Sequence, residues 1–389
     1  MSSRPAPLAS VLSVTFLGSV SGGAFWSATY FVTAAHYGFS AGKNLALAAV
    51  MGAVYAVVAR AAGPILRRFG LVPRTVLAGA LGVWGLVALL PLAFPSREPA
   101  LWVAALAGAV TSGIVWPIVE SYLAAGRHGP ELRRAIGAFN VTWTLATALP
   151  LVFMPLFAHL HVLWTLSISA VVNTLALPFV LSLARSPGSH EHETLGESVG
   201  PEYPWLLRSA SWLLPLSYLM SSTLSPILPH RLASVGALTV PASVVGATWM
   251  LTRFLTLGLM SRLLFWHGKW SALALAGGAL AGGPALVLLS DTTFGIVAGL
   301  ALFGVGAGLT YCLALYYSLA VGKGAVDAGG GFEALIGLGY LAGPLLGLAG
   351  RSFASDRGAA TATVALTWAV AGVVAVLAFG PYRAARRRH

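Results

Sequence analysis

Twelve apolar stretches, each about 20 residues or longer, follow one another along this chain of 389 residues. A stretch of about 18 or more apolar residues with few charges is long enough to cross a bilayer as a helix. Only 9% of the residues are charged, whereas soluble domains average about 25%, so a soluble helical protein with an unusual core is the weaker alternative. The sequence predicts an all-α membrane protein with twelve transmembrane helices, at about 9–34, 42–65, 74–95, 100–124, 135–158, 162–184, 207–228, 240–264, 271–290, 294–320, 329–350 and 359–380.

The longest polar segment of the chain divides these spans into two groups of six. It carries four of the eleven acidic residues, and its composition is typical of a solvated linker. His190 and His192 beside these glutamates leave a metal site as the alternative. We therefore predict an N-terminal six-helix bundle over 1–184, a cytoplasmic linker over 185–206, and a C-terminal six-helix bundle over 207–389 that ends in a basic cytoplasmic tail.

The basic residues predict how the protein sits in the membrane. Of the 23 Lys and Arg residues, 17 fall in inner segments if the N-terminus is inside, and five fall in outer segments. This asymmetry indicates cytoplasmic termini in a plasma (inner) membrane. The basic residues lie in short clusters between spans, so the net charge of +12 does not indicate a nucleic-acid partner. The first apolar run is too long for a signal-peptide core, and we expect it to be retained.

The two groups of spans resemble each other in sequence. Three short matches keep their order, with offsets of 198, 195 and 193 residues: 69–82 with 267–280, 112–126 with 307–321, and 137–143 with 330–336. Each match is weak alone. Together they predict two parallel repeats related by a pseudo-twofold axis, an arrangement in which a substrate site forms between the halves near the bilayer midplane.

The layout of two times six spans, the central polar loop and the stretch GPILRRFGLVPRTVL at 63–77 resemble the major facilitator superfamily. That stretch is similar to the loop signature between the second and third helices of the family. Arg68 and Gly70 fit the signature, whereas Arg67 stands where an Asp is usual. The resemblance, closest to bacterial drug and metabolite exporters, implies secondary transport by alternating access. The missing Asp implies that the charged gate of the family is altered or absent.

Three ionisable residues fall inside predicted spans, where such residues indicate function by default. Glu120 is a candidate for binding a proton or a cationic group, or for pairing with Arg60, Arg133 or Arg134 in a gate. Glu333, at the start of the eleventh span, is a candidate for gating or helix capping. Arg253, the deepest charge, is a candidate for binding an anionic substrate group, or for pairing with an acidic residue such as Glu333.

Aromatic residues predict the character of the substrate cavity. Trp26 and Tyr30 lie four residues apart on one face of the first span, and further aromatic and polar candidates occur on three other spans. Such a lining suits amphipathic organic molecules better than sugars, although aromatic residues also form interfacial belts. The cavity candidates are Trp26, Tyr30, Trp116, Asn140, Trp143, Arg253 and Tyr311, with Tyr316 and Tyr317 nearby on the tenth span.

The stretch GYLAGPLLGLAG at 339–350 places Gly339, Gly343 and Gly347 at about helical spacing around Pro344. Small residues let helix backbones approach closely in lipid, where no hydrophobic force drives helices together. The pattern resembles the Gly-Pro packing motif of the superfamily. It predicts either a packing seam between moving halves or tight packing without a moving part.

Signatures of other functions are missing from the sequence. It contains no Walker-type phosphate loop, no HExxH motif and no Gly-x-Ser-x-Gly elbow, so we expect neither an enzyme nor a cofactor or metal site. Cys312 is the only cysteine. We predict a secondary transporter that exports a small amphipathic compound, coupled to protons through Glu120 or Glu333, and that functions as a monomer in the lipid bilayer. A transporter-like scaffold or assembly factor, a uniporter and an importer stay open as alternatives.

Overall fold

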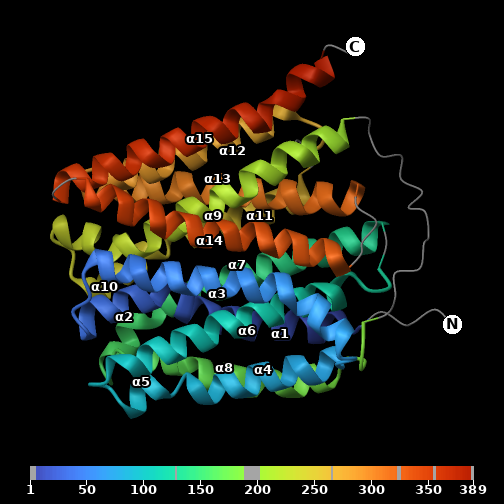
Figure 1. The fold of residues 1–389 in the computed structure, drawn as a ribbon, viewed down its shortest axis with the longest axis horizontal. Helices are drawn as coiled ribbons and strands as arrows, with labels where there is room; N and C mark the ends of the chain where they lie inside the picture. Colours follow the sequence, from blue (N-terminus) through green and yellow to red (C-terminus); the bar gives the residue numbers. More distant parts are fainter. Residues whose placement is uncertain are drawn as a thin grey trace.

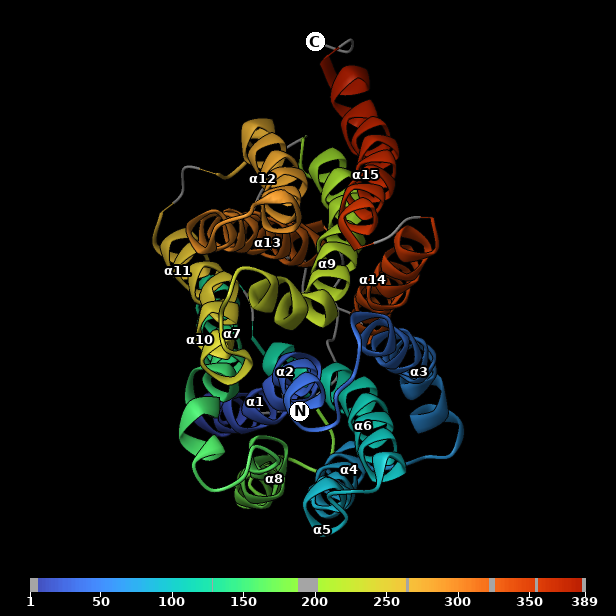
Figure 2. The same cartoon turned by 90° about the vertical axis from the view of Figure 1, so that its left-hand side faces the viewer.

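The computed structural model describes residues 6–127, 129–187, 202–263, 266–321, 326–353 and 356–386, and these residues form helices and no strands. The predicted all-α fold is confirmed. The long helices run side by side along the longest axis of the molecule (Figure 1). Seen along that axis, the helices before the central linker form one group and those after it form another (Figure 2). Most of the predicted linker lies outside the described residues.

The first group consists of nine helical segments that make up six membrane-crossing units. A π-helical turn, η1, joins α1 and α2 into one continuous unit, and a break after Val87 separates α4 from the short α5. The segments are α1 (Leu8–Gly23), η1 (Ala24–Ala28), α2 (Thr29–His36), α3 (Ala41–Arg68), α4 (Pro73–Val87), α5 (Leu90–Ala93), α6 (Glu98–Ala124), α7 (Gly129–Ala158) and α8 (Trp164–Leu181).

The second group repeats this plan. The expected single helix over 240–264 is broken at Ala247, where α10 ends and α11 begins. The segments are α9 (Tyr203–Ser234), α10 (Thr239–Gly246), α11 (Thr248–Arg262), α12 (Trp270–Leu289), α13 (Thr293–Val321), α14 (Val326–Ser352) and α15 (Asp356–Arg386).

Within the described residues, eleven helices are long and apolar enough by themselves to cross a membrane, and α9 is not among them. With 32 residues, α9 is nevertheless about 48 Å long at 1.5 Å per residue, more than a hydrocarbon core of about 30 Å requires. Its hydropathy is low because it carries hydroxyl side chains such as Ser221, Ser222 and Thr223, and these are buried inside the protein. We therefore count α9 as the twelfth spanning helix, one that faces protein.

The helix contacts obey a pseudo-twofold relationship. In the first half, α1 packs on α7, α3 on α6, and α4 on α8; in the second, α9 packs on α14, α11 on α13, and α12 on α15. The contacts between the halves are equivalent in the same way, because α3 packs on α14 and α7 packs on α11. Each half thus contacts the other through the second and the fifth spanning helix of its repeat.

The two halves contact each other at both ends of the molecule. The first residues of α1 and the last turn of α15 lie at one end, here called the terminal end (Figure 1). There, a Cβ atom built on Gly137 of α7 would lie 3.4 Å from the Cβ of Ser261 on α11. At the opposite end, Asn44 of α3 donates a hydrogen bond to the carbonyl oxygen of Pro226 on α9, at 3.4 Å. The two halves are therefore in contact on both sides of the cavity.

The glycines of α14 permit its closest contacts. A Cβ on Gly339 would lie 2.5 Å from the carbonyl oxygen of Pro215, and one on Gly343 would overlap the carbonyl oxygen of Leu219, both on α9. Gly347 instead faces α3 of the other half, where a Cβ would lie 2.7 Å from Leu45. Pro344 is buried in the same helix. The stripe thus packs α14 partly within its own half and partly across the seam.

Candidate functional site

A buried guanidinium enclosed by aromatic rings lies at the centre of the molecule. Arg253, on α11, is only 4% exposed. Its guanidinium carbon lies 4.5 Å from the ring centroid of Trp143, 5.0 Å from that of Tyr311 and 5.5 Å from that of Tyr218. Cations within about 6 Å of an aromatic face are attracted by the ring quadrupole. Three helices, α7, α9 and α13, therefore supply the surroundings of this charge.

Two carboxyl groups from opposite halves form the second part of the site. Glu120 of α6 and Glu333 of α14 lie beside each other and line the same chamber. The hydroxyl of Tyr55, on α3, donates a hydrogen bond to Glu333 Oε2. Glu333 is only 4% exposed. Two ionised carboxylates have no donor between them and repel each other, so a proton shared by the pair would stabilise this arrangement.

Aromatic rings connect the carboxyl pair to Arg253. Tyr340 lies on α14, two turns after Glu333, and its ring contacts that of Tyr55 at 5.6 Å and that of Tyr218 at 5.1 Å between centroids. Trp26 of η1 stacks on Tyr340 at 4.5 Å. Tyr218 in turn accepts a hydrogen bond of 3.3 Å from Arg253. The two charged parts of the site thus share one aromatic wall.

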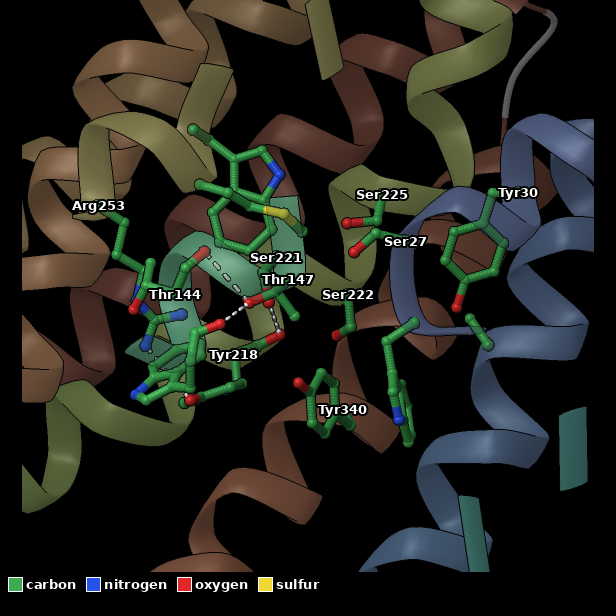
Figure 3. Close-up of a pocket in the computed structure, with 15 residues that line it drawn as sticks. Ser27, Tyr30, Thr144, Thr147, Tyr218, Ser221, Ser222, Ser225, Arg253 and Tyr340 are labelled. Carbon is green, nitrogen blue, oxygen red and sulfur yellow. Dashed lines mark hydrogen bonds between the residues drawn. The ribbon is translucent and has the colours of Figure 1, made fainter. Parts of the chain in front are cut away.

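Two chambers lie along this wall, between the halves. The first has a volume of about 60 Å³ and contains Arg253, and the second has a volume of about 90 Å³ and contains Glu120 and Glu333. Figure 3 shows Arg253 and Thr144 on one side of the first chamber, and Ser27 and Tyr30 on the other. Both chambers are lined by Trp26, Trp143, Thr147, Tyr218 and Tyr340. They are therefore two parts of one central cavity.

The π-helical turn positions one side of this cavity. A Cβ on Gly23 would overlap the backbone of Thr147, so α1 approaches α7 very closely just before the turn. The extra residue of a π-turn rotates the following side chains, and such turns are frequent at functional sites. Here Trp26 and Ser27 on the turn, and Tyr30 just after it, line the chamber.

The residues predicted from sequence fall into two groups in the structure. Trp26, Tyr30, Trp143 and Arg253 line the first chamber, whereas Trp26, Trp116, Glu120, Trp143, Tyr311 and Glu333 line the second. Asn140 is buried behind the wall, where its Oδ1 accepts a hydrogen bond of 3.3 Å from the indole of Trp143. It positions a cavity residue rather than lining either chamber.

Other candidates lie away from the cavity. Gly70 forms the turn after α3 with φ of +59°, in the left-handed region that favours glycine, and Arg68 beside it is exposed. Both therefore belong to the α3–α4 turn. Tyr316 and Tyr317 pack in a separate aromatic cluster with Tyr203 and Trp266.

The ion pairs considered from sequence differ from what the structure contains. Among the described residues, no Arg lies within 4.0 Å of Glu120, and Glu120 contacts Glu333 instead. The side chain of Arg133 lies outside the described residues. In the same described part of the chain, no carboxylate lies within 4.0 Å of Arg253. The two acidic residues lie together and Arg253 lies apart from them, because the helices that carry them contribute to different chambers of the cavity.

Several site residues were missed by the sequence analysis. Tyr55, Tyr218 and Tyr340 connect the charged groups, and Ser221, Ser222 and Ser225 of α9 line the first chamber. The clustered hydroxyls of the stretch SSTLS, at 221–225, were the one available signal. No group of three or more His, Cys, Asp or Glu suited to a metal occurs in the described residues.

Comparisons with known proteins agree with this architecture. The family model of the Major Facilitator Superfamily matches residues 11–344. A search of curated protein sequences finds no match. Similar solved structures include the nucleoside transporter NupG, with a TM-score of 0.67 and 14% identity over 97% of this chain and 98% of that one. The human organic anion transporter MFSD10 has a TM-score of 0.63 and 16% identity, over 95% and 99% of the two chains.

A bacterial homologue of the human lysosomal transporter Spinster, solved in an inward-facing conformation, is also similar, with a TM-score of 0.63 and 11% identity over 97% and 96% of the two chains. The family match covers most of this chain. The chain therefore belongs to the major facilitator superfamily. It is an integral membrane protein with the fold of a transporter, as the sequence predicted.

Proposed function

We propose that this protein is a proton-coupled secondary transporter that exports a small amphipathic organic compound by alternating access. The observation that carries the proposal is the position of the carboxyl pair. Glu120 and Glu333 come from opposite halves and line the same central cavity as Arg253. A group that binds a proton therefore lies in the cavity that would bind a substrate, and on the seam that would open.

The proton acts on the seam through charge. With one proton between them, Glu120 and Glu333 would hold α6 and α14 together by a shared hydrogen bond. Loss of that proton leaves two negative charges in contact, and their repulsion is strong where little water screens it. Protonation then favours the closed form, and deprotonation favours separation of the halves at this point. This link between protonation and conformation is what proton coupling requires.

The cavity supports an amphipathic organic substrate. Its wall is formed by indole and phenol rings with a few hydroxyl groups between them, a lining suited to a molecule with an apolar body and few polar groups. The similar structures include transporters described for nucleosides and for organic anions, which are small organic molecules. We propose export because of the resemblance to bacterial exporters.

We also propose a cytoplasmic location for the terminal end, with the protein a monomer in the plasma (inner) membrane. The distribution of basic residues supports this orientation, since inner segments carry the excess. Near the terminal end of the first half, the last part of α3, the start of α4 and the segments after α6 and α8 contribute Arg60, Arg67, Arg68, Arg74, Arg127 and Arg185.

Transport by purified protein in vesicles with an imposed pH gradient tests the proposal. A panel of fluorescent amphipathic compounds is offered, and both compound movement and proton movement are recorded in each direction. Wild-type protein is expected to move at least one compound in the direction opposite to the protons. The compound should therefore accumulate on the side that the protons leave. Movement of compound and protons in the same direction would refute exchange.

Glu120→Gln and Glu333→Gln should keep downhill movement but lose accumulation driven by the gradient, by about tenfold or more, because an amide does not carry the proton. Glu98→Gln is the matched control, since Glu98 is exposed and pairs with Lys43. Accumulation that survives in both cavity variants would refute proton coupling through this pair. If the wild-type protein moves no compound under any gradient, the scaffold alternative is favoured.

A further inference from the structure

We propose that the substrate carries a carboxylate or a similar planar anionic group, and that this group binds to Arg253. The inference deepens the proposed function and rests on it, because it takes the central cavity to be the substrate site. Arg253 has five N–H donors, yet within the described residues its one hydrogen bond is to the hydroxyl of Tyr218, and Nε has no partner.

The aromatic cage does not replace these hydrogen bonds. Trp143, Tyr311 and Tyr218 attract the positive charge through their ring faces. Rings do not accept hydrogen bonds in the plane of the guanidinium as oxygen atoms do. A buried donor without a partner is costly, so its retention at a cavity wall points to a ligand that accepts from it. A carboxylate fits the planar fork of an arginine with two parallel hydrogen bonds.

The hydroxyl groups of the chamber leave this role to Arg253. Thr144 and Thr147 donate to carbonyl oxygens of their own helix, and so does Ser221. Ser222 donates within α9 and to the carbonyl oxygen of Gly339. With their protons engaged, these hydroxyls present oxygen lone pairs to the cavity. The other hydroxyls of the lining are neutral, whereas Arg253 is the one charged donor among the described residues that line this chamber, so it would be the main partner of an anionic group.

The internal alternative is that Arg253 serves only to balance the acidic pair. Against it, Glu333 is held by Tyr55 and Glu120, and no carboxylate in the described ranges lies within 4.0 Å of the guanidinium. The carboxyl pair also lies in the other chamber. An anionic substrate agrees with export. When one negative charge leaves an inside-negative cell, its electrical free energy falls by about 2.3 kcal/mol per 100 mV of membrane potential.

The rest of the substrate would lie along the aromatic wall. Tyr30 and Ser27 line the side of the chamber away from Arg253 (Figure 3). The chamber volume of about 60 Å³ holds a few water molecules, whereas ligand pockets are typically about 300–1,000 Å³. The halves must therefore separate before an organic anion enters.

Binding measurements with matched pairs of small compounds test this assignment without transport or a pH gradient. The probes are benzoate and benzamide, phenylacetate and phenylacetamide, cinnamate and cinnamamide, and naphthoate and naphthamide. Each pair has the same apolar body and differs in the charged group. Thermal stabilisation of the purified full-length protein, followed by titration, gives the affinity of each probe.

For at least one pair, we expect the acid to bind about tenfold or more tightly than the amide, a difference of ~1.4 kcal/mol. Arg253→Gln should remove this preference, and Arg253→Lys should keep part of it, because lysine retains the charge but lacks the planar fork. Arg262→Gln, at the exposed end of the same helix, is the control and should bind like the wild type. If Arg253→Gln does not fold, the ratio of acid to amide affinity in the wild type and in Arg253→Lys still tests whether an anionic group binds to Arg253.

Equal binding of both members of every pair, or binding of neither, overturns the anion assignment, as does a preference that persists in Arg253→Gln. The two proposals fail separately. Acid-selective binding that depends on Arg253, without any proton-coupled movement in vesicles, overturns the proposed function alone. Proton-coupled transport of neutral or cationic compounds that is unaffected by Arg253→Gln overturns the anion assignment alone.

Discussion

Glu120 on α6 and Glu333 on α14 lie beside each other across the seam between the two halves. Like charges in contact are unfavourable in a buried site unless a proton lies between them. The seam is otherwise built from small residues, as where a Cβ on Gly337 of α14 would lie 2.6 Å from the Cα of Ala56 on α3. The carboxyl pair is thus one of a few polar contacts in a tightly packed interface, together with the bonds from Tyr55 to Glu333 and from Asn44 to Pro226.

Removing the Tyr55 hydroxyl should destabilise the protein. Tyr55→Phe takes away the donor to Glu333 Oε2 and leaves a buried carboxyl short of one partner, at a cost of about 1–3 kcal/mol. Thermal unfolding in detergent measures the change. Tyr37→Phe is the control, because the buried hydroxyl of Tyr37 has no hydrogen-bond partner among the described residues and should be dispensable. Equal midpoints for the two variants would argue against the Tyr55–Glu333 contact.

An added methyl group on the glycine stripe should force α14 away from α9. In Gly343→Ala the new Cβ would overlap the carbonyl oxygen of Leu219, and backbone cannot move aside as a side-chain tip can. We expect a loss of about 1–3 kcal/mol or more, read as a lower unfolding midpoint. Gly372→Ala, on α15, meets no atom within 4 Å and should be neutral or gain up to about 1 kcal/mol in helix propensity. An unchanged midpoint in Gly343→Ala would show that the two backbones are further apart.

A disulfide across the terminal end should lock the closed form. Cysteines at Gly137 and Ser261 would place their Cβ atoms 3.4 Å apart, near the mean of about 3.8 Å in disulfides. In a background with Cys312→Ala, mild oxidation should cross-link the two halves and stop transport in vesicles, and a reducing agent should restore it. Each single cysteine variant serves as a control. If the cross-linked protein transports as fast as the same protein after treatment with a reducing agent, alternating opening at this end would be contradicted.

Replacing Asn44 should weaken the opposite end. Its Oδ1 accepts from the Thr33 hydroxyl at 2.6 Å, and its Nδ2 donates to the carbonyl oxygens of Tyr30 and Pro226 at 3.2 and 3.4 Å. Asn173 is the matched control, since it is equally buried but its side-chain atoms have no hydrogen-bond partner in the described part of the chain. Thermal unfolding should therefore show Asn44→Ala to be less stable than Asn173→Ala by about 1–3 kcal/mol. Equal stability of the two variants would count against the role of Asn44.

The sequence by itself determined the fold of this protein. Whether a segment enters a bilayer depends on its own composition and length, because a helix satisfies its backbone hydrogen bonds within itself. The spans could therefore be predicted from short continuous stretches of sequence. Comparison of such stretches with one another and with the family signature indicated the two repeats and the family resemblance. Even α9, less apolar than the others, was predicted as a span from its apolar run at 207–228.

Tertiary structure alone decided which polar residues meet. In a membrane protein the faces toward lipid and toward neighbouring helices are both apolar, so hydrophobic periodicity says little about the direction in which a side chain points. Glu120, Glu333 and Arg253 were visible as candidates in the sequence. That the two carboxyl groups pair with each other, while the guanidinium lies among three rings from three other helices, follows from how twelve helices pack, through contacts between residues far apart in the chain.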